Sequence, residues 1–171
     1  MPSTWLPRPR GDKAVLPCAM SKAKKADTTR GLSPRVAVAG CGHWGQNLVR
    51  NFAALGSLAA VTDREPAVAG AFAEKYGVSA RSWPELLADD GIDGIVVASP
   101  AATHYRLAQE ALGTGKHVFV EKPLALRSAE ALELCRLAKD SGQILMVGHL
   151  LQYHPAFRRL KELVRNGDLG R

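Results

Sequence analysis

Aromatic residues and cysteines are scarce in this sequence, and long apolar runs are missing. Aromatics make up 6% of 171 residues, and the cysteines Cys18, Cys41 and Cys135 show no CxxC pair or metal-ligand spacing. A disulfide framework and a metal site are therefore not expected, and the cysteines are interpreted as reduced thiols. No apolar run approaches the roughly 18 residues of a membrane-spanning helix, and no secretory signal is recognisable. We expect a cytoplasmic protein without a membrane partner.

Acidic residues are in deficit, with 16 Asp and Glu against 23 Lys and Arg and a formal net charge of +7. Residues 1–33 hold seven basic and two acidic residues, and therefore five of these net charges. From Pro34 onward the charges nearly balance, at sixteen basic against fourteen acidic. A nucleic-acid-binding protein concentrates basic residues on its folded surface. We therefore expect no nucleic-acid partner.

The first 33 residues are rich in Pro, Lys, Arg, Ser and Thr and show no hydrophobic periodicity. This composition predicts a disordered basic tail. Met20 opens a short polar run, Met-Ser-Lys-Ala-Lys-Lys, typical of a natural start. We hypothesise that Met20 is the initiator, and an intact mass with Met1 or Pro2 at the terminus would overturn this.

From Arg35 onward, short apolar runs alternate with amphipathic segments. The apolar runs predict strands and the amphipathic segments predict helices. Expected strands cover residues 36–39, 58–62, 78–80, 95–98, 118–120 and 144–147. Expected helices cover residues 46–55, 66–76, 82–87, 103–112 and 157–165, with one more that Ser128 caps and Gly142 ends. The alternation predicts an α/β fold, a doubly wound parallel-sheet Rossmann domain.

Two of these helices show an apolar face in the sequence. In the helix over 46–55, Leu48, Phe52 and Leu55 fall on one face. In the helix after Ser128, Leu132, Cys135 and Ala138 fall on one side. These faces are the ones expected to contact the sheet.

A glycine-rich loop follows the first expected strand. Gly40-Cys-Gly42-His-Trp-Gly45 fits the pattern G-x-G-x-x-G and opens the first helix. In that pattern the first glycine permits a tight turn, the second lets the backbone approach a pyrophosphate, and the third lets helix and strand pack closely. The helix N-terminus offers N–H groups to phosphates. We expect His43 and Trp44 to lie near the pyrophosphate.

An acidic residue, Asp63, ends the second expected strand. A carboxylate there can accept hydrogen bonds from the adenosine ribose and repels a 2′-phosphate, which favours NAD. The guanidinium of Arg64 could accommodate that phosphate, so NADP is the alternative. Asp63 could also simply cap the next helix. S-adenosylmethionine is a second candidate ligand, because its binding proteins also use glycine-rich first loops.

The segment Glu121-Lys122-Pro123 follows the fifth expected strand. It resembles the Glu-Lys-Pro signature of the Gfo/Idh/MocA oxidoreductases. The resemblance runs from about Arg35 to Arg171, and includes the glycine loop, the Ser99-Pro100 turn with His104 after it, and the run from Gly148 to Pro155.

This resemblance implies an NAD(P)-dependent dehydrogenase acting on CH–OH groups of sugars, sugar nucleotides or polyols. Lys122 would be the catalytic residue, because an amine near the nicotinamide can move the hydroxyl proton and stabilise negative charge. Glu121 would lie beside the cofactor, and Ser99 and Pro100 near the nicotinamide ribose. His104 could line the cofactor pocket or be structural.

The residues after the sixth strand concern the substrate. The resemblance places His149, Tyr153 and His154 at a junction with a second domain. Gln152 stands near the place where the family often has arginine, so a close substrate assignment does not follow. The run resembles members that act on UDP-linked amino sugars. His117 is expected to be structural.

The resemblance also implies a C-terminal α+β substrate domain, which is absent from this sequence. We expect a tail over residues 1–33, a dinucleotide-binding domain over 34–155, and a linking helix over 156–171. Full-length relatives are expected to be homo-oligomers. The alternatives are a stand-alone nucleotide-binding module, an inactive fragment, or an unrelated Rossmann-type methyltransferase. A fragment would expose apolar surface around Leu150, Leu151 and Phe157.

Overall fold

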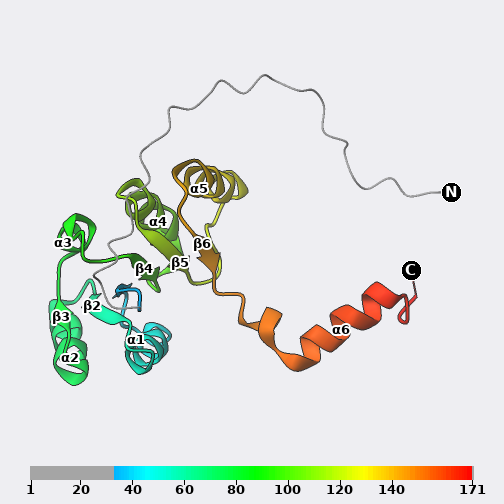
Figure 1. The fold of residues 1–171 in the computed structure, drawn as a ribbon, viewed down its shortest axis with the longest axis horizontal. Coiled ribbons are helices and arrows are strands. Elements are labelled where there is room, and N and C mark those ends of the chain that lie inside the picture. The colour runs from blue at the N-terminus through cyan, green and yellow to red at the C-terminus, as the bar shows by residue number, and fades with distance from the viewer. Residues whose placement is uncertain (1–32, 171) are drawn as a thin grey trace, which may run out of the picture.

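The computed structural model describes residues 33–170, which contain a parallel six-stranded sheet with helices on both faces (Figure 1). The strands are β1 (Val36–Ala39), β2 (Leu58–Thr62), β3 (Ser79–Ala80), β4 (Gly94–Val97), β5 (His117–Val120) and β6 (Leu145–Val147). The helices are α1 (Gly45–Ala54), α2 (Pro66–Tyr76), α3 (Trp83–Ala88), α4 (His104–Gly113), α5 (Ser128–Ser141) and α6 (Pro155–Asn166), with short 3-10 helices η1 (Ala101–Thr103) and η2 (Leu150–Tyr153). The predicted doubly wound α/β fold is confirmed. The predicted tail and the Met20 hypothesis concern residues outside the described range.

The central strands are buried on both faces, which is why they are continuous apolar runs. Successive side chains of a strand point to opposite faces. In β1, Ala37 and Ala39 contribute to one core cluster, whereas Val36 and Val38 contribute to the other. Two cores therefore lie on the two sides of a single sheet.

The helices divide between these two cores. Leu86 of α3, Leu112 of α4 and Leu134 of α5 are fully buried in one core. Val49 of α1 and Ala73 of α2 are buried in the other. Figure 1 accordingly shows α4 and α5 on the side of the sheet opposite α1 and α2.

The buried face of α5 differs from the expected one. Leu134 and Ala138, spaced four residues apart, pack on the sheet, whereas Leu132 is 58% exposed and Cys135 is exposed. The helix has apolar residues around much of its circumference, so the contact with its neighbours rather than periodicity decides its rotation. Arg127, not Ser128, is the N-cap residue, and no side chain caps this end.

The face of α1 is also narrower than expected. Val49 is fully buried, with Leu48 and Phe52 packed beside it. Leu55 is 68% exposed, because it follows the last helical residue and no longer faces the sheet.

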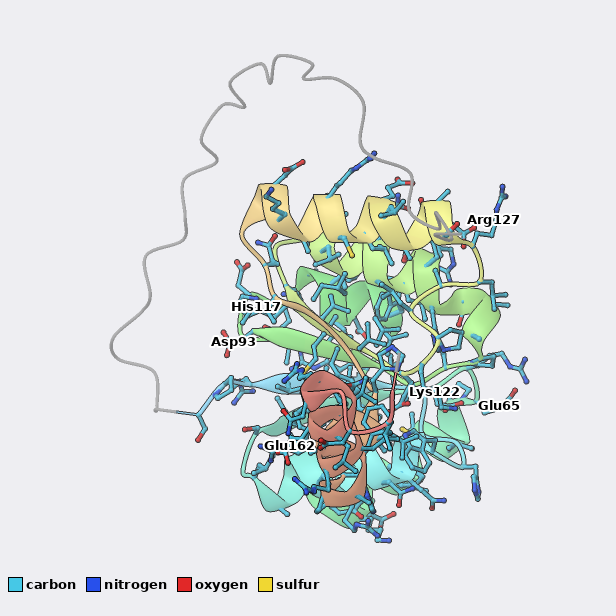
Figure 2. All side chains as sticks on the ribbon, turned by 90° about the vertical axis from the view of Figure 1, so that its right-hand side faces the viewer. Glu65, Asp93, His117, Lys122, Arg127 and Glu162 are labelled. Atoms are coloured by element: carbon cyan, nitrogen blue, oxygen red, sulfur yellow. The ribbon has the colours of Figure 1, made fainter. Side chains whose placement is uncertain are left out.

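The strand order is β3-β2-β1-β4-β5-β6. From β1 the chain adds β2 and then β3 on one side. It then returns to the centre of the sheet and adds β4, β5 and β6 on the other side of β1. A ligand crevice forms at such a reversal, at the carboxyl ends of the strands. In Figure 2, Lys122 and Glu65 lie at this end of the sheet, whereas Asp93 and His117 lie at the opposite end.

Helix α6 projects away from the sheet (Figure 1) and contains no buried residue. Leu150 and Leu151 just before it are 54% and 68% exposed, which confirms the expected exposed apolar surface there, whereas Phe157 is partly buried. Within residues 33–170, no helix has the length and apolar character needed to cross a membrane.

Candidate functional site

A cleft of about 790 Å³ opens at the carboxyl ends of the strands around the reversal point. Half of the twelve predicted site residues line it: Gly40, Gly42, Asp63, Arg64, Ser99 and Pro100. The other half lie outside its lining: His43, Trp44, Gly45, His104, Glu121 and Lys122. The structure therefore brings together the glycine loop, the end of β2 and the loop after β4.

The three glycines of the loop meet different surroundings. Gly40 has φ +98°, and a Cβ on it would lie 2.7 Å from the carbonyl oxygen of Ala98. A Cβ on Gly45 would overlap the carbonyl oxygen of Gly40. A Cβ on Gly42 would meet no described atom within 4 Å. The folded chain thus needs glycine at 40 and 45, whereas the space beside Gly42 is open to a ligand.

The loop also offers hydrogen-bond donors. Among the described residues, the backbone N–H groups of Gly42, His43 and Trp44 have no acceptor, and α1 carries no acidic residue in its first turn. A helix N-terminus with free N–H groups favours an anion. A pyrophosphate would fit both the open space beside Gly42 and these donors.

Asp63 connects the glycine loop to the end of β2. Its Oδ2 accepts the N–H of Cys41 at 2.7 Å, and its Oδ1 accepts the N–H of Glu65 at 3.0 Å. Glu65 is the N-cap residue of α2. Asp63 therefore forms a hydrogen bond with the backbone at the start of that helix, as the capping alternative expects, and it also lines the cleft. Each carboxylate oxygen keeps a further lone pair for a ligand hydroxyl. The Arg64 side chain is 92% exposed and pairs with Glu65 at 3.4 Å.

Cys41 lies inside the glycine loop but is only 3% exposed. Burial, and then the negative charge of Asp63, raise the pKa of its thiol to about 11. The thiol is therefore neutral near pH 7 and is no nucleophile. Cys41 acts in the site through its backbone N–H, which donates a hydrogen bond to the carboxylate of Asp63.

Several cleft residues were not predicted from the sequence. Arg81 and Ser82 come from the turn after β3, Trp83 is the first residue of α3, and Arg106 and Leu107 come from α4. The indole Nε1 of Trp83 donates to Glu110 at 2.6 Å, which fixes the ring between α3 and α4. In the sequence, Arg81, Ser82 and Trp83 could be recognised only by their position after a strand. That strand, β3, has just two residues and gives a weak pattern.

The loop after β4 is held by its own hydroxyl groups. Ser99 Oγ and Thr103 Oγ1 lie 2.6 Å apart, and Thr103 Oγ1 donates to the carbonyl of Pro100 at 2.7 Å. His104 follows and is 1% exposed. Its ring contacts backbone carbonyl oxygens of Ser99 and Pro123 rather than the cleft.

Glu121 and Lys122 form a second cluster just past β5. Glu121 is 7% exposed, and its Oε2 accepts the N–H of Lys122 at 3.3 Å. Its Oε1 is buried and has no partner among the described residues. A Cβ on Gly148 would lie 2.9 Å from that oxygen, so glycine leaves the carboxylate its space. Lys122 is exposed, its ammonium has no hydrogen-bond or ion-pair partner within residues 33–170, and the Lys122–Pro123 peptide is cis.

The remaining histidines have local structural contacts. His117 Nδ1 accepts the N–H of Ile144 at 3.0 Å, as expected for a structural residue. His154 Nδ1 accepts the N–H of Ala156 at 3.3 Å and caps α6. His149 and Tyr153 are exposed. Within the described range, no three His, Cys, Asp or Glu side chains are grouped so as to hold a metal ion.

Sequence comparison identifies the family. A sequence model described as "Oxidoreductase family, NAD-binding Rossmann fold", that of the Gfo/Idh/MocA proteins, matches residues 34–149. The chain belongs to this family. The Gfo/Idh/MocA match covers the glycine loop, the turn after β4 and the Glu-Lys-Pro segment.

Two of the similar relatives are named for sugars attached to nucleotides. The chain is 34% identical over 152 residues to the dTDP-3,4-didehydro-2,6-dideoxy-alpha-D-glucose 3-reductase of Streptomyces violaceoruber, covering 86% of this chain and 44% of that protein. It is 32% identical over 131 residues to the UDP-N-acetylglucosamine 3-dehydrogenase of Acidithiobacillus ferrooxidans, covering 75% and 41%.

A solved structure shows the same fold with a cofactor. A 3-ketoreductase from Actinomadura kijaniata in complex with NADP matches with a TM-score of 0.73 and 30% identity, over 81% of this chain and 45% of that one. The chain spans less than half the length of the relatives it matches.

Proposed function

We propose that this chain binds NAD across the carboxyl ends of its strands, as the nucleotide-binding part of an oxidoreductase. The pyrophosphate would lie at the glycine loop, the adenosine ribose at Asp63, and the nicotinamide near Ser99 and Lys122. Residues 34–155 would form the dinucleotide-binding domain, and 156–171 would lead to a substrate domain.

The observation that carries this proposal is the loop around Gly42. The open space and the unpartnered N–H groups of this loop suit an anionic group. Asp63 is attached to the same loop, because its carboxylate accepts the N–H of Cys41. The second cluster supports it, because the buried Oε1 of Glu121 lacks a donor in the described chain. A bound ligand with an N–H or O–H group would supply one.

Asp63 favours NAD over NADP. A carboxylate facing the ribose accepts hydrogen bonds from its hydroxyl groups and repels a 2′-phosphate. Arg64 lies in the lining of the same cleft with its side chain largely exposed, so it is the residue through which NADP would be tolerated. NADP is the alternative cofactor, because the similar 3-ketoreductase was solved in complex with NADP.

The reaction proposed for the full-length protein is hydride transfer between the cofactor and a CH–OH group of a sugar, sugar nucleotide or polyol. The nicotinamide supplies the hydride chemistry. Lys122, exposed at the carboxyl end of β5, would accept the hydroxyl proton at Nζ as a neutral amine during oxidation, and as an ammonium it would stabilise the developing alkoxide and return the proton during reduction. A homo-oligomer is proposed for the full-length form.

The test is a titration of the full chain with NADH and NADPH, following nicotinamide fluorescence. We expect saturable NADH binding, tighter than NADPH binding. Asp63→Asn removes the charge and should weaken NADH binding by about tenfold while narrowing its advantage over NADPH. Saturable binding of S-adenosylmethionine with no response to either nicotinamide cofactor would overturn the proposal.

A further inference from the structure

His104 is the first residue of α4, and both of its ring nitrogens contact backbone carbonyl oxygens. Nε2 lies 2.8 Å from the oxygen of Ser99, and Nδ1 lies 2.7 Å from the oxygen of Pro123. The two oxygens belong to segments that follow different strands, β4 and β5. With 1% exposure, the ring has no access to water that would replace either partner.

Both partners of the ring are acceptors only. A neutral imidazole carries one N–H, so it can donate to one carbonyl and would turn a lone pair toward the other. Two lone pairs facing each other at 2.8 Å do not make a hydrogen bond. The ring thus donates one hydrogen bond and packs against the second carbonyl, so it contacts both loops at once.

We propose that His104 is a positioning residue whose ring, hydrogen-bonded to one carbonyl and packed against the other, holds the Lys122–Pro123 segment against the Ser99–Thr103 loop. On the Ser99 side, the Oγ contact with Thr103 extends the restraint through the loop that lines the cleft. On the Pro123 side, the restrained carbonyl is one residue beyond Lys122, whose ammonium has no hydrogen-bond or ion-pair partner within residues 33–170. His104 thereby sets where the Lys122 amine lies relative to the cleft.

The functional consequence rests on the proposed NAD binding. Among the described residues, Asp63 and the glycine loop form no hydrogen bond with His104, whereas the segments of Ser99 and Pro123 contact its ring directly. Loss of His104 should therefore affect the nicotinamide half only. ADP-ribose, which lacks the nicotinamide, separates the two halves.

The experiment compares the full-length chain with His104→Phe, His104→Gln and the control Leu112→Ala. Leu112 is 1% exposed near the other end of α4, so its truncation lowers stability without touching either carbonyl. We expect His104→Phe to weaken NADH binding about tenfold with little change for ADP-ribose. The NADH affinity of His104→Gln, which keeps a side-chain donor group, should lie between those of wild type and His104→Phe. Leu112→Ala should change neither the NADH nor the ADP-ribose affinity. An equal loss for both ligands in His104→Phe, or the same NADH loss in Leu112→Ala, would assign His104 a merely structural role.

A measurement without cofactor tests the contact itself. The NMR spectrum of the wild-type chain should show a hydrogen-bonded His104 ring N–H that exchanges slowly with water, and a ring N–H in fast exchange overturns the restraint. If the wild-type chain binds neither ligand, the proposed function fails, whereas this spectrum still decides the role of His104. Hydrogen exchange at the amides of Thr103 and Glu121, faster in His104→Gln than in Leu112→Ala, is the outcome expected in the folded variants.

Discussion

Gly42 and Gly45 belong to one loop, yet a side chain would meet open space at the first and backbone at the second. Packing within the chain therefore explains only Gly45. The requirement at Gly42 comes from the ligand that we place there, and the two residues form a matched pair for a test.

We predict that Gly42→Ala folds normally but loses cofactor binding. Its unfolding free energy should stay within about 1 kcal/mol of wild type, because the added methyl group meets no described atom. NADH affinity should fall by about tenfold or more. Gly45→Ala should lower the unfolding free energy by at least about 2 kcal/mol. Urea unfolding and a fluorescence titration measure both quantities, and unchanged NADH affinity in Gly42→Ala would contradict the pyrophosphate placement.

Cys41 gives a pH-dependent prediction at the same scale. Its pKa is about 11 in the folded chain against an ordinary 9.0, so folding disfavours the thiolate. The stability this provides is complete below pH 9 and is lost as pH rises toward 11, by up to about 2–3 kcal/mol. The unfolding free energy measured between pH 8 and 11 should thus fall less steeply in Cys41→Ala than in wild type. Identical slopes for the two proteins would mean that the thiol is not buried as described.

Among the secondary-structure elements, α5 shows where sequence periodicity is insufficient. Leu132 and Leu134 are both apolar and two residues apart, and the sequence favours the wrong one as the buried residue. Leu134 is 0% exposed, whereas Leu132 is 58% exposed. The packing of α5 against α4 and the sheet decides between them, and a pattern confined to one helix does not contain that contact.

This rotation of α5 is testable with two truncations. Leu134→Ala leaves a cavity in the core and should lower the unfolding free energy by roughly 2–5 kcal/mol. Leu132→Ala should change it by no more than about 0.5 kcal/mol. Chemical denaturation gives both values, and a larger loss in Leu132→Ala would show that the helix presents its other side to the sheet.

The same contrast explains which site residues were predictable. Gly40, Asp63 and Lys122 follow strong apolar strands, so their place at the carboxyl edge of the sheet could be inferred from sequence. Trp83 follows the two-residue β3 and takes its position from Glu110, twenty-seven residues away. The contact of His104 with Pro123 likewise joins the start of α4 to the segment after β5, nineteen residues along the chain. Such long-range contacts leave no local signal.

At the scale of the whole molecule, the main feature is apolar surface outside the two cores. Leu160 and Val164 of α6 are 45% and 59% exposed, and α6 has no buried residue. We predict that the chain binds a hydrophobic dye and that the double variant Leu160→Glu, Val164→Glu binds clearly less. Its thermal midpoint and NADH affinity should match wild type, because neither residue packs in a core. A lowered thermal midpoint would instead show that α6 packs against the sheet.

The central claim is that a dinucleotide lies across the carboxyl edge of this sheet, and NADH titration into ¹⁵N-labelled protein tests it most directly. We predict saturable amide shift changes in four regions: Gly42–Gln46, Asp63–Glu65, the segment around Ser99 and the segment around Lys122. Amides near Asp93 and His117, at the opposite end of the sheet, should stay unchanged (Figure 2). Shifts confined to that opposite end, or no saturable change at all, would contradict the account.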